Sequence, residues 1–329
     1  KKGDNMINAP YAEQAFEHLL KFWRFENYKR PAIAITSKNP DYTYKKIKTP
    51  EKIIDRWLDI EYVISINRDR LNRTLFFGDA LPYVNLNLGP DVFAALYGCE
   101  VIHDDRTSWA VHDNTRSLKE YDLSKVDEQG FWWKKTMEMT KALVEDSNDD
   151  YLVGVTDIHA GLDALVSLRG PEQVCLDLYD EPDEVKRLCM ELFEGFKEYF
   201  NQICSIIETK QKGHVNWLGP WSDKRWYVTS CDFIYMISEE MFLEFELPLL
   251  KAELEFLGRS IFHLDGIGSL RHLDQLLKLD NLNGIQWVPG AGKPTASYWI
   301  DIYKKIQDAG KINYIYPSPE ELPVLLEHL

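Results

Sequence analysis

The chain has 329 residues, of which 45% are hydrophobic and 28% are charged, and this ordinary globular composition is sufficient for a large core. It contains 38 lysines and arginines against 53 aspartates and glutamates, a formal charge of −15 without any basic cluster, so we do not expect it to bind nucleic acid. No apolar run approaches the ~18 residues that span a bilayer, which argues against a membrane protein.

The first 70 residues are predicted to form a helical extension. Helices are expected over 10–30 and 50–70, with a short apolar run at 31–35 between them. Residues 74–90 are strand-like but interrupted by glycine and proline, and a short helix follows from Asp91 to Leu96. The polar segment 103–129 is expected to be irregular, and we interpret it as an excursion over the mouth of a barrel.

From residue 130 onward, predicted helices alternate with short predicted strands. The helices are expected at 130–146, 161–168, 171–179, 183–210, 238–257, 269–278, 295–309 and 318–328. The strands are expected at 151–156, 214–217, 233–237, 261–263, 284–287 and 312–316.

This alternation predicts an α/β protein with parallel βαβ units. With about seven or eight units, a (β/α)8 TIM-type barrel over residues 71–329 is favoured over a doubly wound sheet. The chain contains neither a Gly-x-Gly-x-x-Gly after a strand nor a P-loop, which weakens a nucleotide-binding interpretation. An eighth strand is not accounted for.

A buried strand that ends in titratable residues is the most informative feature of the chain. The apolar run 260–262 leads to His263, Asp265 and Gly266. Residues two apart on a strand point to the same side, and barrel strands carry catalytic residues at their carboxyl ends. His263 and Asp265 are therefore candidates for binding a metal or moving a proton. The alternative is a hydrogen-bonded pair that only fixes the following turn.

A second pair of this kind, Asp157 and His159, follows the predicted strand 151–156. We regard both residues as catalytic candidates. The alternative is that Asp157 caps the next helix while His159 is buried with its polar atoms satisfied.

Cys231 and Asp232 precede the predicted strand 233–237 and are also candidates. A thiolate near a histidine can bind zinc, although a lone cysteine in an apolar segment is more often simply buried. The five cysteines are odd in number and contain no Cys-x-x-Cys pair, which predicts a reduced, cytoplasmic protein without disulfides.

Candidate substrate-binding residues lie at strand ends and in the loops beyond them. Tryptophans there can wall an apolar or cationic ligand, or merely pack, and polar side chains on an early strand can bind a substrate. These candidates are Trp217, Trp221, Trp287, Asp79, Asn85 and Asn87.

Four passages, 78–98, 154–170, 232–248 and 262–266, resemble the uroporphyrinogen decarboxylase superfamily in their order and spacing. The resemblance covers residues 70–329. It implies a (β/α)8 barrel with a deep cleft at its C-terminal end. It also implies one of two chemistries: cofactor-free decarboxylation of uroporphyrinogen, or methyl transfer that uses a corrinoid protein and zinc.

The chain departs from both patterns of that superfamily. The Arg-Gln-Ala-Gly-Arg motif that binds substrate carboxylates in the decarboxylases is not found. The zinc motif of the methyltransferases is His-x-Cys followed by a distant Cys; His263 matches its first position, but Asp265 stands where the Cys would be. We therefore expect either a harder zinc site made of His263, Asp265 and a third residue such as Cys231, or a metal-free site in which His263 is a general acid.

The leading hypothesis is a single-domain barrel enzyme with residues 1–70 packed on it. It would move a methyl group from a small O- or N-methylated substrate to the cobalt of a separate corrinoid protein, with Asp157, His159 and Asp232 orienting the substrate. The alternatives are a decarboxylase or other lyase of carboxylated substrates and a non-catalytic binder of a corrinoid or tetrapyrrole. Arginines that could bind a substrate carboxylate are Arg106, Arg169 and Arg225. The substrate, the metal content and the oligomeric state stay open.

Overall fold

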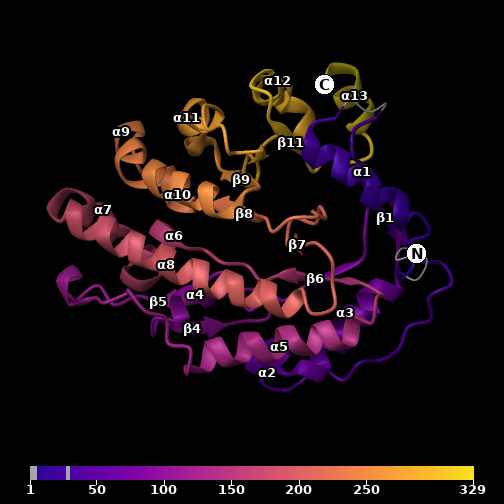
Figure 1. Ribbon diagram of the computed structural model, residues 1–329, viewed down its shortest axis with the longest axis horizontal. Coiled ribbons are helices and arrows are strands. Elements are labelled where there is room, and N and C mark those ends of the chain that lie inside the picture. The colour runs from indigo at the N-terminus through magenta and orange to yellow at the C-terminus, as the bar shows by residue number, and fades with distance from the viewer. Residues whose placement is uncertain (1–5, 27–29) are drawn as a thin grey trace. The chain divides into compact units, whose positions relative to one another are not determined.

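The computed structural model describes residues 6–26 and 30–329, which form two compact units of mixed α/β structure (Figure 1). Unit 1 comprises the described residues of Lys1–His112 together with Leu123–Ile158 and Glu194–Arg225. Unit 2 comprises Asp113–Asp122, His159–Phe193 and Trp226–Leu329. The helix α8 (Pro182–Ile207) contributes to both units.

Unit 1 contains a three-stranded parallel sheet and two antiparallel strand pairs. The parallel sheet has the order β3 (Tyr83–Asn85), β6 (Leu152–Val155), β7 (Val215–Asn216). The antiparallel pairs are β1 (Ala34–Lys38) with β2 (Thr74–Gly78), and β4 (Glu100–His103) with β5 (Ser108–Val111). Its other helices are α1 (Ala12–Arg24), α2 (Ile53–Leu58), α3 (Ile60–Asn72), α4 (Val92–Ala95) and α5 (Phe131–Ser147).

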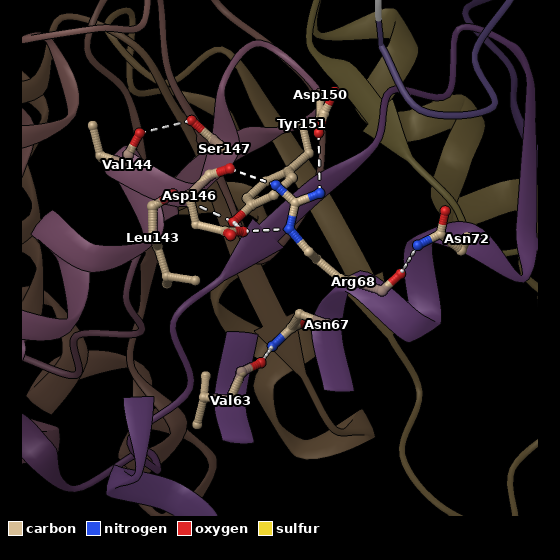
Figure 2. Close-up of polar contacts among 10 residues, drawn as sticks. All are labelled: Val63, Asn67, Arg68, Asn72, Leu143, Val144, Asp146, Ser147, Asp150 and Tyr151. Carbon is tan, nitrogen blue, oxygen red and sulfur yellow. Dashed lines mark hydrogen bonds and ion pairs between the residues drawn. The ribbon is translucent and has the colours of Figure 1, made fainter. Parts of the chain in front are cut away.

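A half-buried polar cluster fixes the start of β6 within unit 1 (Figure 2). Arg68 of α3 contacts Asp146 at 2.7 Å and Asp150 at 3.0 Å, and the hydroxyl of Tyr151 donates to Asp146 at 2.7 Å. These charge-assisted bonds join α3 to the end of α5 and so set where the following strand begins.

Unit 2 contains a four-stranded parallel sheet whose strands lie in the order in which they occur in the chain. These strands are β8 (Tyr227–Ser230), β9 (Ser260–Asp265), β10 (Gly284–Val288) and β11 (Ile312–Tyr314), in the orange to yellow part of Figure 1. Helical segments precede, connect and follow the strands. They are η1 (Leu118–Glu120), α6 (Gly161–Arg169), α7 (Pro171–Asp180), η2 (Asp232–Met236), α9 (Glu239–Met241), the π-helix η3 (Phe242–Glu246), α10 (Leu247–Leu257), η4 (Ile267–His272), α11 (Leu273–Leu277), η5 (Ala296–Trp299), α12 (Ile300–Asp308) and α13 (Leu322–His328).

Strand β9 is at the centre of unit 2, between β8 and β10. Its residues on both faces are buried, as in parallel strands covered by helices, except that His263 and Asp265 are half-buried. The partly exposed polar residues of β9, His263 and Asp265, therefore lie at its carboxyl end, as the sequence predicts.

Most predicted elements are present, but the expected strand at 233–237 is wrong. That segment is the helical turn η2, and the strand is β8 at Tyr227–Ser230. Phe233 and Ile234 are buried while Tyr235 and Met236 are exposed, a helical rather than an alternating pattern. As a result, Cys231 and Asp232 follow a strand instead of preceding one.

Two further expectations need correction. The segment expected to be irregular at 103–129 contains β5, which forms a hairpin with β4. The helix expected over 50–70 is divided at Asp59, whose carboxylate accepts the backbone N–H of Tyr62 and so begins α3.

The predicted helix over 10–30 is α1, and the part of that prediction at 27–29 lies outside the described residues, as do residues 1–5 of the predicted extension. Within the described ranges, no helix combines the length and the apolar character that crossing a membrane requires.

Candidate functional site

Strands β8 and β9 bring three candidate residues together in unit 2. Their parallel pairing aligns Ser230 with His263, so Asp232, two residues later, arrives level with Asp265. A nitrogen of His263 and one carboxylate oxygen each from Asp232 and Asp265 lie within 4.8 Å of one another. One imidazole and two carboxylates are a ligand set that suits zinc and other divalent metals.

A second group shares Asp232 with the first. It consists of His159, Asp163 and Asp232, whose ligand atoms also lie within 4.8 Å of one another. His159 precedes α6 and Asp163 lies in its first turn, so the two are one helical turn apart, with Nδ1 3.4 Å from Oδ2. Asp232 is thus the residue on which both groups converge.

Asp163 fixes this arrangement through the backbone. Its two carboxylate oxygens accept hydrogen bonds from the N–H groups of Asp232, at 2.9 Å, and Phe233, at 3.0 Å. The carboxylate therefore caps η2 and ties α6 to the segment that carries Asp232.

The surroundings of Asp232 raise the pKa of its carboxyl group. Asp232 is exposed as a residue, but neighbouring groups exclude water from its carboxylate, and this desolvation raises its pKa. Repulsion from Asp163 and Asp265 raises it further, although His159 and His263 act in the opposite direction. Burial alone would raise the pKa of Asp163 too, but its contacts with His159 and with the two backbone N–H groups lower it. Three carboxylates around two imidazoles leave an excess of negative charge that a divalent cation would neutralise.

Two neighbouring residues complete the surroundings of β9. Nδ1 of His263 lies 2.6 Å from Oε1 of Gln286, its register partner on β10. Gly266, with φ +79°, makes the turn after Asp265, and a Cβ there would lie 2.8 Å from the ring of Tyr235. The turn is therefore covered closely by an aromatic ring, and only glycine fits.

The residues present fit a metal ion. Within the described part of the chain, Oδ1 of Asp265 is buried without a hydrogen-bond partner. A buried carboxylate oxygen without a donor is costly unless a cation satisfies it.

Cys231 belongs to neither group of ligand atoms. Its Sγ lies 3.7 Å from Oδ1 of Asp163, and burial, together with the nearby Asp163 and Glu246, raises the pKa of this thiol well above its usual value. Burial likewise raises the pKa of Glu246, in the π-helix, to about 8. Cys231 is thus a protonated thiol against Asp163, which does not favour its predicted role as a zinc ligand.

Trp287 lies on the other face of the sheet from His263. It pairs with Leu264, while Gln286 pairs with His263, and paired residues in a parallel sheet share a face. Its buried ring packs edge-to-face on Trp299 at 5.3 Å. This contact fits the packing alternative, and the role of Trp287 in binding a substrate stays a prediction.

The remaining predicted residues belong to unit 1. Asp157 follows β6 and is half-buried. The carboxylate of Asp79 is buried and binds Arg30 at 2.6 Å, His18 at 2.8 Å and the N–H of Ile33 at 2.7 Å. Asp79 therefore anchors the segments that contain these three residues.

The amides and indoles of unit 1 make local contacts. Asn85 Nδ2 contacts the carbonyl of Leu86 at 3.5 Å, and exposed Asn87 accepts the N–H of Gly89 at 3.1 Å. The half-buried Trp217 accepts the hydroxyl of Tyr83 at its carbonyl, 3.1 Å away. Trp221 is buried; its indole donates to the carbonyl of Lys212 at 3.0 Å, and its ring meets Phe16 edge-to-face at 4.8 Å.

Two of the arginines that could bind a substrate carboxylate bind protein carboxylates instead. Arg169 is buried against Asp177, with Nη2 to Oδ1 at 3.0 Å, and Arg225 pairs twice with Glu208 at 2.7 Å. These pairs weigh against a decarboxylase-like anion site at either residue.

Sequence reasoning missed two residues of this site, Asp163 and Gln286. A signal for Asp163 was present, because it lies four residues after His159 at the start of a predicted helix. The signal for Gln286 was a single amide within an otherwise apolar strand.

No protein-family model matches the chain, and no curated protein matches it either. Among solved structures, the fold is similar to that of a methyltransferase from Methanosarcina mazei, with a TM-score of 0.52 and 12% sequence identity. The similarity covers 75% of this chain and 79% of the other. At this identity, the likeness establishes a shared fold.

Proposed function

We propose that this protein is a methyltransferase that takes a methyl group from a small O- or N-methylated compound and passes it to a separate corrinoid protein. The observation that carries the proposal is the convergence of Asp232, His263 and Asp265 at the carboxyl ends of β8 and β9. The fold shared with a methyltransferase and the resemblance in motifs support it.

In this proposal, His263, Asp265 and Asp232 hold a zinc ion. A bound zinc ion would act as a Lewis acid that polarises the oxygen or nitrogen from which the methyl group departs. In this proposal, Asp163 holds Asp232 in place, and His159, which contacts Asp163, exchanges a proton with the departing atom. Two carboxylates make this site harder than a thiolate site, which favours an oxygen or amine leaving group over a thiol.

We further propose that residues 71–329 form a (β/α)8 barrel and that residues 1–70 form a helical extension. In each sheet, the strands follow the order of the chain, as they do in such barrels. A cytoplasmic location remains a prediction from the cysteine pattern.

The test is demethylation by purified protein with zinc, with chemically reduced cobalamin as the methyl acceptor. Methoxylated aromatic compounds and methylamines would be supplied, and the demethylated product measured by mass spectrometry. We expect product with at least one substrate class, and a loss of at least ~100-fold in His263→Ala and Asp232→Ala, because each removes a group that stabilises the departing charge. Absence of product from the whole panel, with cobalamin and with a corrinoid protein, would reject the proposal.

A further inference from the structure

We propose that Gln286 is a positioning residue that holds the imidazole of His263 with its proton on Nδ1, so that a metal ion held with Asp232 and Asp265 would bind at Nε2. The role of this positioning, to prepare His263 for binding a metal, rests on the proposed function. The tautomer itself, however, is a property of the metal-free protein.

The contact between the two side chains is built into the sheet. Gln286 and His263 are register partners on the parallel strands β10 and β9, and Oε1 lies 2.6 Å from Nδ1. Gln286 is 2% exposed and lies between β9 and β11, where Tyr314 is its other register partner. A buried amide with a strand on each side has little freedom to turn away.

The chemistry of the amide oxygen decides the tautomer. A carbonyl oxygen only accepts hydrogen bonds, so Nδ1 of His263 must donate to it. In a neutral imidazole with its proton on Nδ1, Nε2 is the basic nitrogen. A neutral His263 in this state binds a cation through Nε2 and has no proton there to give. The contact therefore favours a metal ligand over the alternative of a general acid.

The two histidines of the site differ in this respect. The partner of His159 is the carboxylate of Asp163, at 3.4 Å, and a carboxylate stabilises a protonated imidazole. Nδ1 of His263 meets a neutral amide instead, which gives no such stabilisation at that nitrogen. The arrangement thus assigns proton exchange to His159 and ligation to His263.

The test begins with the tautomer. In metal-free protein labelled with 15N-histidine, long-range 1H–15N correlation spectra distinguish the two nitrogens, and the His263 signals are identified by their loss in His263→Gln. We expect His263 of the wild type to be protonated on Nδ1. Gln286→Glu, which keeps an oxygen acceptor, should preserve this pattern, and Gln286→Leu should shift His263 toward the Nε2-protonated form.

Zinc affinity supplies the second readout, measured by competition with a chelating dye. We expect Gln286→Leu to bind zinc about 10–100-fold more weakly and Gln286→Glu to stay within about threefold of the wild type. Gln211→Leu is the control for general destabilisation, because the Gln211 side chain binds the backbone of Val153 in unit 1. It should leave zinc affinity unchanged.

Protonation of His263 on Nε2 in the wild type would overturn the inference, and this result does not depend on whether Gln286→Leu folds. An unchanged tautomer in Gln286→Leu would overturn it as well. If the tautomer is as expected but the wild type binds no zinc, the proposed function fails while the positioning by Gln286 stands.

Discussion

The backbone N–H of Asp232 donates a hydrogen bond of 2.9 Å to the carboxylate of Asp163, a residue 69 positions earlier in the chain. Because the same carboxylate also accepts the N–H of Phe233, it sets the direction in which the Asp232 side chain leaves the backbone. The position of Asp232, which belongs to both ligand groups, thus depends on the buried Asp163. Asp163 is not one of the three proposed zinc ligands.

Asp163→Asn is predicted to weaken zinc binding by about 10–100-fold. One carboxylate oxygen becomes an amide N–H₂ that opposes a backbone donor, so the segment around Asp232 shifts. Chelator competition measures the affinity. Asp274→Asn, on the surface of α11 and paired with Lys305, is the control and should match the wild type. Equal affinity in Asp163→Asn and the wild type would refute the role assigned to Asp163.

His263→Ala is predicted to abolish stoichiometric zinc binding, and His328→Ala, at the exposed end of α13, to retain it. The reason is that the removal of one of three protein ligands leaves two carboxylates, which hold zinc weakly. Elemental analysis of the purified proteins measures this. Zinc retained in full by His263→Ala would exclude His263 as a ligand.

Asp265→Cys is predicted to tighten zinc binding by about tenfold, and Asp265→Ala to weaken it by at least as much. The first change supplies a softer thiolate at the same strand position, whereas the second removes the ligand. The comparison uses chelator competition on both variants. If the two variants bind zinc equally, Asp265 does not contact the ion.

Glu246 should make the stability of the protein depend on pH. Burial raises its pKa to about 8 in the folded state, so the folded protein binds a proton that the unfolded chain loses from about pH 4.5 upward. Stability should therefore fall as the pH rises from about 4.5 to 8, by at most about 5 kcal/mol from this group. Denaturant unfolding at several pH values measures the slope.

Glu246→Gln should flatten that slope, because an amide does not ionise. Glu244→Gln is the matched control, since Glu244 is an exposed carboxylate in the same π-helix, paired with Lys186. A slope as steep in Glu246→Gln as in the wild type would show that other groups cause it.

Asp79→Asn is predicted to destabilise the protein by about 1–3 kcal/mol at pH 7. Burial alone would raise the pKa of Asp79, but its bonds to Arg30, the N–H of Ile33 and His18 outweigh burial and lower it. A lowered pKa stabilises the folded state above the ordinary carboxyl range and ceases to do so as the pH falls through it. The difference between Asp79→Asn and the wild type should therefore shrink below about pH 4.

Denaturant unfolding at pH 7 and at pH 3.5 or below tests this expectation for Asp79. Asp41→Asn, an exposed site in unit 1, should change stability by less than about 0.5 kcal/mol at either pH. A constant difference between Asp79→Asn and the wild type would contradict the ion-pair explanation.

Local patterns in the sequence predicted most of the elements, because helix periodicity, caps and short apolar runs act over a few residues. His263 and Asp265 were identifiable in this way, since an apolar run that ends in titratable residues is a local signal. The strand at 233–237 was assigned wrongly because a run such as Phe233-Ile-Tyr-Met-Ile237 does not by itself distinguish a strand from a helical turn.

The sequence by itself determined the α/β class, the alternation of strands and helices, and the presence of a histidine and an aspartate at the end of β9. Only the tertiary structure decided that Asp232 lies beside Asp265, that Asp163 holds Asp232, and that Gln286 meets Nδ1 of His263. These pairs are separated by 23 to 69 residues, and strand register and helix packing bring them together. Contacts over such distances arise from the packing of the whole unit, and no local pattern of residues encodes them.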